Sequence, residues 1–323
     1  MANLTVPSSR KMVVAMKAET AYGVDIFAGS YTAADIVPAF DIRPSQPPQV
    51  IENLSQGGHL GRLPNIVNLP TAQVSFAMNL RGKGVAYSSS TKPESDMPFR
   101  ACGLSSTFSG GTGAEIITYI PTDTHESFTI YIVQQNGTAL KLVGAFGTFS
   151  LGMTAGGVKV ARYTFSGQHG GEADVTFVAG ALSTTPQYPV MKSAAFQIGT
   201  ENYAPRIAQM GFDQNNVVAG VPSINAASAL AGYIIADRVP RLTMDPEAAT
   251  LATFGWYTKF NAGTLMDCTF QTGTTLYNVI KMAFLNLQLV DKGWSTRDNL
   301  TAFPATLAAI LASGNDDFSI VFS

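Results

Sequence analysis

The stretch TIYIVQQNGTALKLVGAFGTFSLGMTAGGVKVARYTF, residues 129–165, predicts an antiparallel β-meander and decides the fold class of the chain. Hydrophobic residues recur at every second position on both sides of Asn136-Gly137, a dipeptide typical of tight hairpin turns. In the strand that follows, apolar residues alternate with Thr148, Ser150 and Gly152. One face of this strand is therefore hydrophobic, and the other is small and uncharged.

Much of this pattern returns 136 residues further along the chain, which indicates an internal duplication. The matched pairs are Gln135 with Gln271, Gly137 with Gly273, Thr138 with Thr274, Leu140 with Leu276, Phe149 with Leu285, Leu151 with Leu287, Met153 with Leu289 and Gly157 with Gly293. A constant offset that keeps both the alternation and the turns supports duplication. The alternative is that any two meanders share such a pattern.

The segments around the two meanders repeat as well. Each half is expected to hold a strand, a long loop, a second strand, a helix and the meander, in this order. The long loops are residues 44–70 and 213–237, and connections of such length typically bind a partner or carry function. Acid-proline signals are expected to start the helices at Asp96 and Asp245, and glycines to end them at Gly103 and Gly263.

The predicted fold is mainly β, with two tandem domains of β-sandwich or barrel type, each with one flanking α-helix and one long inter-strand loop. The expected boundaries are an N-terminal arm at 1–35, a first domain at 36–167, a linker at 168–195 and a second domain at 196–323. Apolar residues in the arm predict that it docks on some surface instead of forming a flexible terminus. The linker, rich in Gly, Thr and Pro, is expected to hold one strand at 175–178.

The composition predicts a protein that hides surface in an assembly. Of 323 residues, 46% are hydrophobic and only 13% are charged, whereas typical domains have about 25% charged residues. So few charges solvate a large free surface poorly. A neutral secreted β protein is the alternative that composition leaves open. The net charge of −2 and the lack of a basic run argue against tight binding of nucleic acid through its phosphates.

The sequence contains no pattern that indicates catalysis or metal binding, so the chain is predicted to be no enzyme and to need no cofactor. His59, His125 and His169 lack the spacing of metal ligands. Cys102 and Cys268, each among apolar neighbours, are expected to be buried thiols rather than a disulfide. The first residues lack a signal-peptide core, and no apolar run reaches the roughly 18 residues of a membrane span, so a soluble protein is expected.

Four short motifs are spread over nearly the whole chain: Glu19-Thr20-Ala21-Tyr22-Gly23-Val24-Asp25, Phe99-Arg100-Ala101-Cys102-Gly103-Leu104, Lys141-Leu142-Val143-Gly144-Ala145-Phe146-Gly147-Thr148 and Ser313-Gly314-Asn315-Asp316-Asp317-Phe318-Ser319-Ile320. In sequence and order they resemble tail tube (major tail) proteins of long-tailed bacteriophages. The resemblance implies tube-type β-sandwich domains that form stacked rings around the channel through which the genome is ejected. Because six such domains make a ring in that family, a duplicated chain is expected to need three copies.

The resemblance also implies the partners and the location. The chain is expected to bind copies of itself in trimeric, pseudo-hexameric rings, and to meet tail terminator, distal tail and tape-measure proteins. DNA is expected to pass through the lumen without specific binding, and no membrane is involved. The expected location is the virion tail, with the host cytoplasm as the site of assembly.

Two surfaces are hypothesised from these considerations. The small, uncharged face of the meander is expected to line the lumen, where the absence of lysine and arginine would keep phosphates from sticking. Its residues are Thr148, Ser150, Gly152, Asn286 and Gln288. The two long loops are expected to make ring-to-ring contacts through Gln49, Asn53, Arg62, Leu63, Asn65, Asp213, Asn215, Val217 and Val218.

Other functions stay open at this point. A carbohydrate- or receptor-binding β-sandwich module would need exposed aromatic side chains clustered on one face, whereas Trp256 and Trp294 are far apart in the sequence. Another tail or capsid structural protein, such as a terminator or decoration protein, is closer to the tail tube hypothesis. A hydrolase is the third alternative. Tubes or stacked rings in electron micrographs would favour the tail tube.

Overall fold

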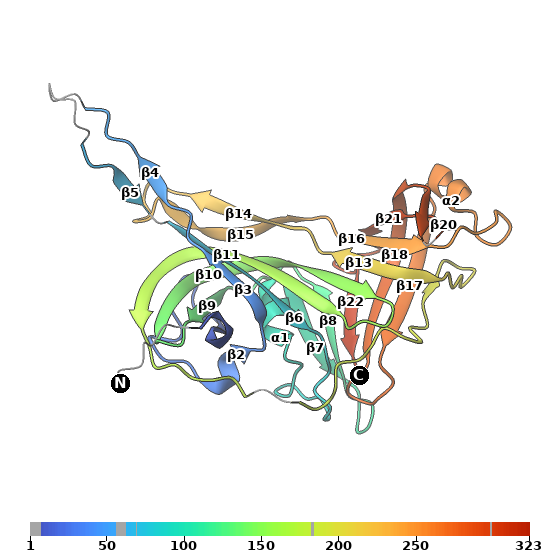
Figure 1. Cartoon of the computed structure of the whole chain (residues 1–323), viewed down its shortest axis with the longest axis horizontal. Helices are drawn as coiled ribbons and strands as arrows, with labels where there is room; N and C mark the ends of the chain where they lie inside the picture. Colours follow the sequence, from blue (N-terminus) through green and yellow to red (C-terminus); the bar gives the residue numbers. More distant parts are fainter. Residues whose placement is uncertain (1–7, 56–62, 69, 182–183, 298) are drawn as a thin grey trace.

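The computed structural model describes residues 8–55, 63–68, 70–181, 184–297 and 299–323, and it confirms a mainly β protein (Figure 1). Strands make up 50% of the chain and helices 6%. The first half contains β1 (Val13–Ala18), β2 (Ile36–Val37), β3 (Phe40–Ser45), β4 (Gln49–Ile51), β5 (Ile66–Asn68), β6 (Thr71–Asn79), α1 (Asp96–Ala101), β7 (Leu104–Ser109), β8 (Ile116–Pro121), β9 (Phe128–Val133), β10 (Thr138–Thr154) and β11 (Val160–Asp174). The second half contains β12 (Gln197–Ile198), β13 (Ile207–Asp213), β14 (Asn216–Pro222), β15 (Leu230–Arg238), β16 (Arg241–Pro246), α2 (Trp256–Ala262), β17 (Leu265–Thr272), β18 (Ile280–Lys292), β19 (Ser295–Arg297), β20 (Leu300–Ala302), β21 (Ala305–Ile310) and β22 (Ser319–Phe322).

The predicted meander forms strands β9, β10 and β11. β9 and β10 pair antiparallel around Asn136-Gly137. The backbone N–H of Gly137 donates to the carbonyl of Gln134 at 2.9 Å, which closes the turn. Gly137 has φ = 90°, and a side chain there would stand 2.5 Å from the carbonyl oxygen of Val175. Conformation and space therefore both require glycine at this turn.

The two halves share one strand order. The hydrogen-bonded order is β1-β9-β10-β11-β6-β3 in the first half and β12-β17-β18-β21-β16-β13 in the second, with every pair antiparallel. Each helix follows the matching strand, α1 after β6 and α2 after β16. The first half differs by an inserted hairpin, β7–β8. A repeated topology of this kind is what an internal duplication would produce.

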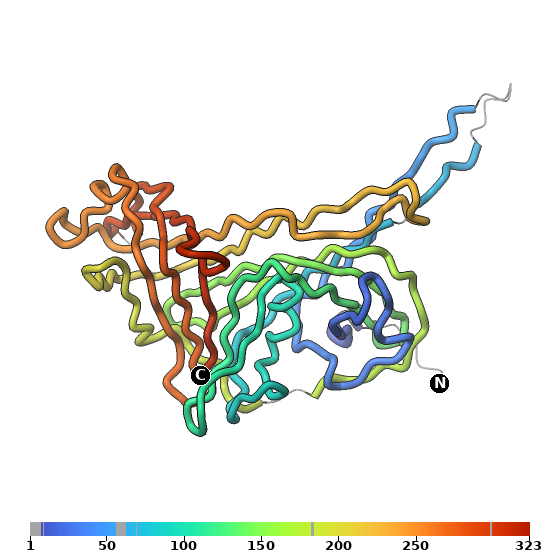
Figure 2. Tube along the Cα trace, turned by 180° about the vertical axis from the view of Figure 1, so that it is seen from behind, coloured from blue at the N-terminus to red at the C-terminus, as the bar shows by residue number. Residues whose placement is uncertain are grey.

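The halves are joined into one sheet and share one hydrophobic core (Figures 1 and 2). β10 of the first half pairs with β13 of the second, and β22 pairs with both β18 and β8. One cluster of buried side chains extends from Val14 to Phe322. The arm belongs to this body, as its apolar residues predicted, because β1 pairs with β9. Cys102 and Cys268 are free and buried, as predicted.

The predicted start of the second helix is wrong. Asp245 and Pro246 end strand β16, and α2 begins only at Trp256. The carboxylate of Asp245 accepts hydrogen bonds from the backbone N–H groups of Ala208 and Gln209 at 3.0 and 2.9 Å, so the acid serves strand β13 instead of capping a helix. The predicted end is confirmed, since Gly263 caps α2 in the left-handed conformation with φ = 61°.

The offset of 136 residues fails within β18. Leu287 and Leu289 are buried, but Leu285, expected on the same face, is 55% exposed. A register shift between β17 and β18 places two residues of β18, Leu285 and Asn286, opposite the single residue Asp267 of β17. Such a bulge reverses the alternation, so Leu285 points away from the core.

The expected linker differs from the structure at its first residues. β11 extends to Asp174, and residues 175–181 form no strand, so the strand expected at 175–178 is absent from this described segment. Lys159 is fully buried between the two halves of the chain. Its Nζ donates to the carbonyl of Ile280 at 3.2 Å and lies 5.3 Å from the ring centre of Phe270. Burial lowers the pKa of Lys159 to about 7.

Candidate assembly interface

The uncharged face of β10 lies on the side of the sheet away from the core. Phe149 and Leu151 are buried, whereas Thr148 and Ser150 are half-buried and Gly152 is exposed. The alternation of β10 is therefore as predicted.

This face continues across both halves of the chain. Residues at paired positions of antiparallel strands point to the same face. One such row consists of Arg162 of β11, Ser150 of β10, Asp213 of β13, Arg241 of β16, Ala308 of β21 and Gln288 of β18. Asn286 is paired with Ile310 nearby on β18. The five residues expected at the lumen thus lie on one continuous sheet.

The face contains arginine, contrary to expectation. Arg162 is paired with Ser150, and Arg241 is paired with Asp213. Both arginines are exposed, and within the described residues neither forms an ion pair. Alternation along a single strand could not predict these arginines. Which side chains of neighbouring strands lie on the same face depends on how the strands pair.

A hollow of about 960 Å³ connects this face to the second long connection. Its walls include Ser150 and Gly152 from the sheet together with Asp213, Asn215 and Val217. The structure therefore brings together residues that were expected to act at two different surfaces.

Both long connections are two-stranded antiparallel ribbons rather than irregular loops. β4 pairs with β5 to form the β4–β5 ribbon, and β14 pairs with β15 to form the β14–β15 hairpin. Pairing within each ribbon satisfies backbone groups without help from the main sheet. The positions of the two long connections were therefore predicted correctly. The prediction that they are loops is wrong.

The residues expected at ring-to-ring contacts are divided between these ribbons. On the first, Gln49 opens β4, Asn53 follows β4, and Leu63 and Asn65 precede β5. Arg62 lies outside the described residues. On the second, Asp213 ends β13, Asn215 follows it, and Val217 and Val218 belong to β14.

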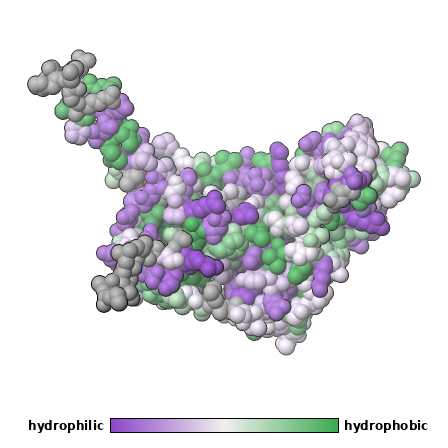
Figure 3. Space-filling view, in the orientation of Figure 1, coloured by the Kyte–Doolittle hydropathy of each residue, from purple (hydrophilic) through white to green (hydrophobic). Residues whose placement is uncertain are grey.

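The β4–β5 ribbon projects from the body and carries exposed hydrophobic side chains (Figures 1 and 3). Each of them is at least 46% exposed, and they are Val50, Ile51, Leu54, Leu63, Ile66 and Val67. An isolated two-stranded ribbon is marginally stable in water, and grouped apolar residues of this kind mark a partner-binding surface.

The β14–β15 hairpin is fastened to the first half. The side-chain amide of Asn216 donates to the carbonyls of Gly147 and Cys102 at 2.9 and 2.7 Å. The backbone N–H of Asn216 donates to the hydroxyl of Thr148 at 3.1 Å. Thr148, expected at the lumen, therefore also holds the base of the hairpin.

Tyr22 holds the other end of the same hairpin. Its hydroxyl accepts a hydrogen bond from the backbone N–H of Tyr233 at 2.6 Å and lies 3.4 Å from the carbonyl oxygen of Gly144, to which it donates. Burial raises the pKa of Tyr22, which keeps the hydroxyl protonated. Close by, the side-chain amide of Gln168 donates to the carbonyl of Leu230 at 2.8 Å. Sequence reasoning missed this contact because no local signal links positions so far apart.

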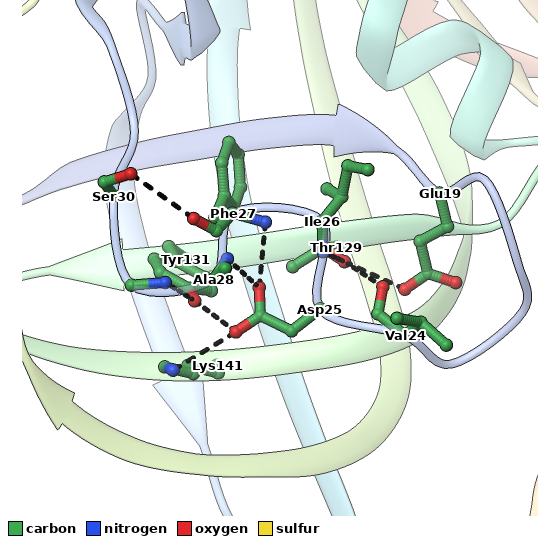
Figure 4. A network of polar contacts seen from close by, with 11 residues as sticks. Glu19, Val24, Asp25, Ile26, Phe27, Ala28, Ser30, Thr129, Tyr131 and Lys141 are labelled. Carbon is green, nitrogen blue, oxygen red and sulfur yellow. Dashed lines mark hydrogen bonds and ion pairs between the residues drawn. The ribbon is translucent and has the colours of Figure 1, made fainter.

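Two carboxylates, Glu19 and Asp25, connect the loop that contains Tyr22 to the neighbouring strands (Figure 4). Glu19 accepts hydrogen bonds from the N–H of Gly144 at 2.8 Å and from the hydroxyl of Thr129 at 2.9 Å. Asp25 accepts from the Tyr131 hydroxyl and pairs with Lys141 at 3.2 Å. Burial alone would raise the pKa of Asp25, but the hydrogen bonds from Tyr131, Lys141 and the backbone N–H of Phe27, together with the charge of Lys141, lower the pKa overall. The motif Glu19–Asp25 thus forms a hydrogen-bonded loop that positions Tyr22.

The described part of the chain offers no cluster of three or more His, Cys, Asp or Glu residues suited to a metal ion. Over the same residues, no helix has the length and apolar character needed to cross a membrane.

No protein-family model matches this chain, and a search of curated proteins gave no match.

Proposed function

We propose that this chain is a structural protein of the bacteriophage tail tube, which polymerises into stacked rings and forms the channel for genome ejection. The halves act as two tandem tube domains, so that three chains make one pseudo-hexameric ring. The proposal assigns no enzymatic activity and no cofactor.

The junction between β10 and β13 carries this proposal. β13 pairs with β16 on one edge and with β10 of the first half on the other. β3, the counterpart of β13, pairs only with β6 among the described strands and leaves its other edge open. Exposed strand edges invite pairing with another chain. If β3 of each copy joins the second half of a neighbour, the same junction recurs around a ring and closes it head to tail.

In the proposed ring, the sheet face away from the core and the two ribbons also have roles. The face with Ser150, Gly152 and Gln288 lines the lumen, where DNA passes and the tape-measure protein lies. Arg162 and Arg241 are exposed cations in that face, and the carboxylate of Asp213 in the same row opposes their attraction for phosphates. The ribbons contact neighbouring copies, and the end rings meet the tail terminator and distal tail proteins. Assembly takes place in the host cytoplasm and ends in the virion tail.

Electron microscopy and native mass spectrometry of the purified protein test the proposal. We expect rings or tubes, and a ring mass of three 34.1 kDa chains. Rings that never stack would favour a terminator, and a protein that remains monomeric at every concentration and salt condition tested would contradict the proposal.

A further inference from the structure

The second half exposes a group of aromatic side chains around α2. Tyr257 and Phe260 of α2 are 57% and 37% exposed, and Trp294, in the turn after β18, is 72% exposed. In Figure 1, α2 and β20 lie at the end of the molecule opposite the β4–β5 ribbon. Single exposed apolar residues are common on proteins, whereas several aromatic rings gathered in one place indicate a binding surface.

Lys292 and Phe303 join these rings into one aromatic patch, residues 257, 260, 292, 294 and 303. The Lys292 ammonium lies 3.0 Å from the ring centre of Tyr257 and 5.2 Å from that of Phe260. The buried ring of Phe303 lies 5.9 Å from the same ammonium and 5.2 Å from the ring centre of Trp294. Side chains from α2, from the end of β18 and from the loop after β20 therefore meet at one place.

The aromatic patch rests on a packed base of further rings. Phe303 stacks on Trp256 with ring centres 6.3 Å apart, and Trp256 packs against Phe254 at 4.6 Å. Both Trp256 and Phe254 are buried. Rings held in this way lose little conformational freedom when a ligand binds, so the patch is preorganised. Trp256 and Trp294, which are far apart in the sequence, thus contact the same phenylalanine.

The aromatic patch and the residues proposed to line the lumen lie on opposite faces of the sheet. Lys292 is paired with Ala305, whereas Gln288 is paired with Ala308. Ala305 belongs to the core, and Ala308 is three residues further along β21, so their side chains point to opposite faces. Paired residues share a face. A ligand of the patch would therefore lie outside the proposed channel.

The aromatic patch has one unpaired cation among the described residues. The ammonium of Lys292 forms no ion pair with them and keeps its hydrogen atoms to donate. Asp291 is exposed, but its pairing with Thr306 places it on the other face of the sheet, and Asp298 lies outside the described residues. Two further cations of α2 and β19 are neutralised at 2.7 Å, Lys259 by Glu201 and Arg297 by Asp245.

We propose that the aromatic patch is a carbohydrate-binding site. The C–H groups on one face of a sugar ring carry a slight positive charge and pack on the electron-rich faces of aromatic rings such as Trp294. The Lys292 ammonium and the Tyr257 hydroxyl, for which the described residues provide no hydrogen bond, are available to sugar hydroxyls. A stable protein partner would need about 20–30 residues on each side, far more than this patch contains.

Tryptophan fluorescence tests the proposal, because the chain has two tryptophans. Trp256 is 3% exposed and Trp294 is 72% exposed, so a ligand on the surface meets Trp294 alone. The full chain is first applied to an array of immobilised bacterial oligosaccharides, and the oligosaccharide that it binds most strongly is then titrated in solution. We expect a saturable change in fluorescence with a dissociation constant of about 1 mM or below. Binding to no oligosaccharide of the array would overturn the proposal.

A variant pair locates the site. Trp294→Ala is expected to weaken binding by about tenfold or more, whereas Phe108→Ala, at a 38% exposed aromatic residue of β7, is the matched control and should bind as the wild type does. Thermal unfolding checks that both variants fold. Equal binding by the two folded variants would refute the site.

Ring formation is measured on the same samples. Loss of rings in Trp294→Ala with unchanged sugar binding would assign the aromatic patch to a contact between copies and would overturn the proposal. Wild-type protein that binds an oligosaccharide through Trp294 but forms no rings would support the site and count against the proposed tail tube function alone.

Discussion

The hydroxyl of Tyr22 accepts a hydrogen bond from the backbone N–H of Tyr233 at 2.6 Å, across 211 positions of sequence. This contact joins the loop after the first strand to the hairpin of the second half. It shows how the halves hold one another besides the shared sheet and core.

Removing the Tyr22 hydroxyl should loosen the β14–β15 hairpin. Tyr22→Phe loses the acceptor for Tyr233 N–H but keeps the ring that stacks on Phe146. We expect a loss of about 1 kcal/mol in local stability, which is roughly fivefold faster hydrogen exchange at the Tyr233 amide. Tyr31→Phe, which removes a hydroxyl bonded to Val178, is the control and should leave exchange in the hairpin unchanged. Equal exchange at Tyr233 in all three proteins would contradict the role of Tyr22.

A side chain at position 232 should displace Tyr22. A Cβ atom there would stand 2.2 Å from the Tyr22 hydroxyl. Gly232→Ala is expected to lower the free energy of unfolding by about 1–3 kcal/mol through this overlap. In the Tyr22→Ala background the cost should shrink, so a double-mutant cycle by chemical denaturation measures the coupling. Additive effects would mean that Gly232 acts through its backbone rather than through Tyr22.

Stability should rise with pH because of Lys159. Burial lowers its pKa in the folded protein to about 7, against 10.5 for an ordinary lysine. Between these values the unfolded chain binds more protons, so folding becomes more favourable as pH increases, by roughly 1.4 kcal/mol for each unit of pKa difference. Below pH 7 both states are protonated and this dependence ends.

Lys159→Met should therefore be more stable than the wild type near pH 7. Its stability should also change less with pH between pH 7 and 10. Thermal unfolding across this range measures the difference, with Lys281→Met, at an exposed lysine, as the control. Parallel profiles for the wild type and Lys159→Met would show that Lys159 does not titrate in this range.

A charge on the open edge of β3 should block assembly. Phe40 is 43% exposed on this edge strand, and Phe40→Lys adds a cation where pairing with another copy is proposed. We expect rings to require at least a tenfold higher protein concentration, with little change in monomer stability. Sedimentation velocity measures this, and Leu251→Lys is the control at a position away from the edge. Unchanged assembly would show that β3 is not part of the ring junction.

Several features could be predicted because they depend on nearby residues. The face of β10 with Ser150 follows from strict alternation, and the turn at Gly137 follows from its left-handed conformation. The C-terminal end of α2 follows from Gly263 in the same way. The start of α2 could not be predicted, since the acid-proline signal at Asp245 was outweighed by hydrogen bonds to the neighbouring strand.

The candidate interface also has features that depend on nearby residues and features that depend on distant segments. The two long connections were found by their length, but that they form ribbons depends on pairing between separate segments. The exposure of Leu285 depends on a bulge that only the partner strand reveals. That Arg162 and Arg241 lie on the same face as Ser150 depends on the pairing of four strands, β11, β10, β13 and β16.

The sequence by itself determined the β class, the turns and the repeated order of elements, because alternation, glycine conformation and an internal offset are properties of residues near one another or of the chain compared with itself. Only the tertiary structure decided that the halves share a sheet through β10 and β13, that Tyr22 meets Tyr233, and that one ribbon is seated while the other is free. These depend on hydrogen bonds and packing between segments far apart along the chain, for which the local pattern contains no signal.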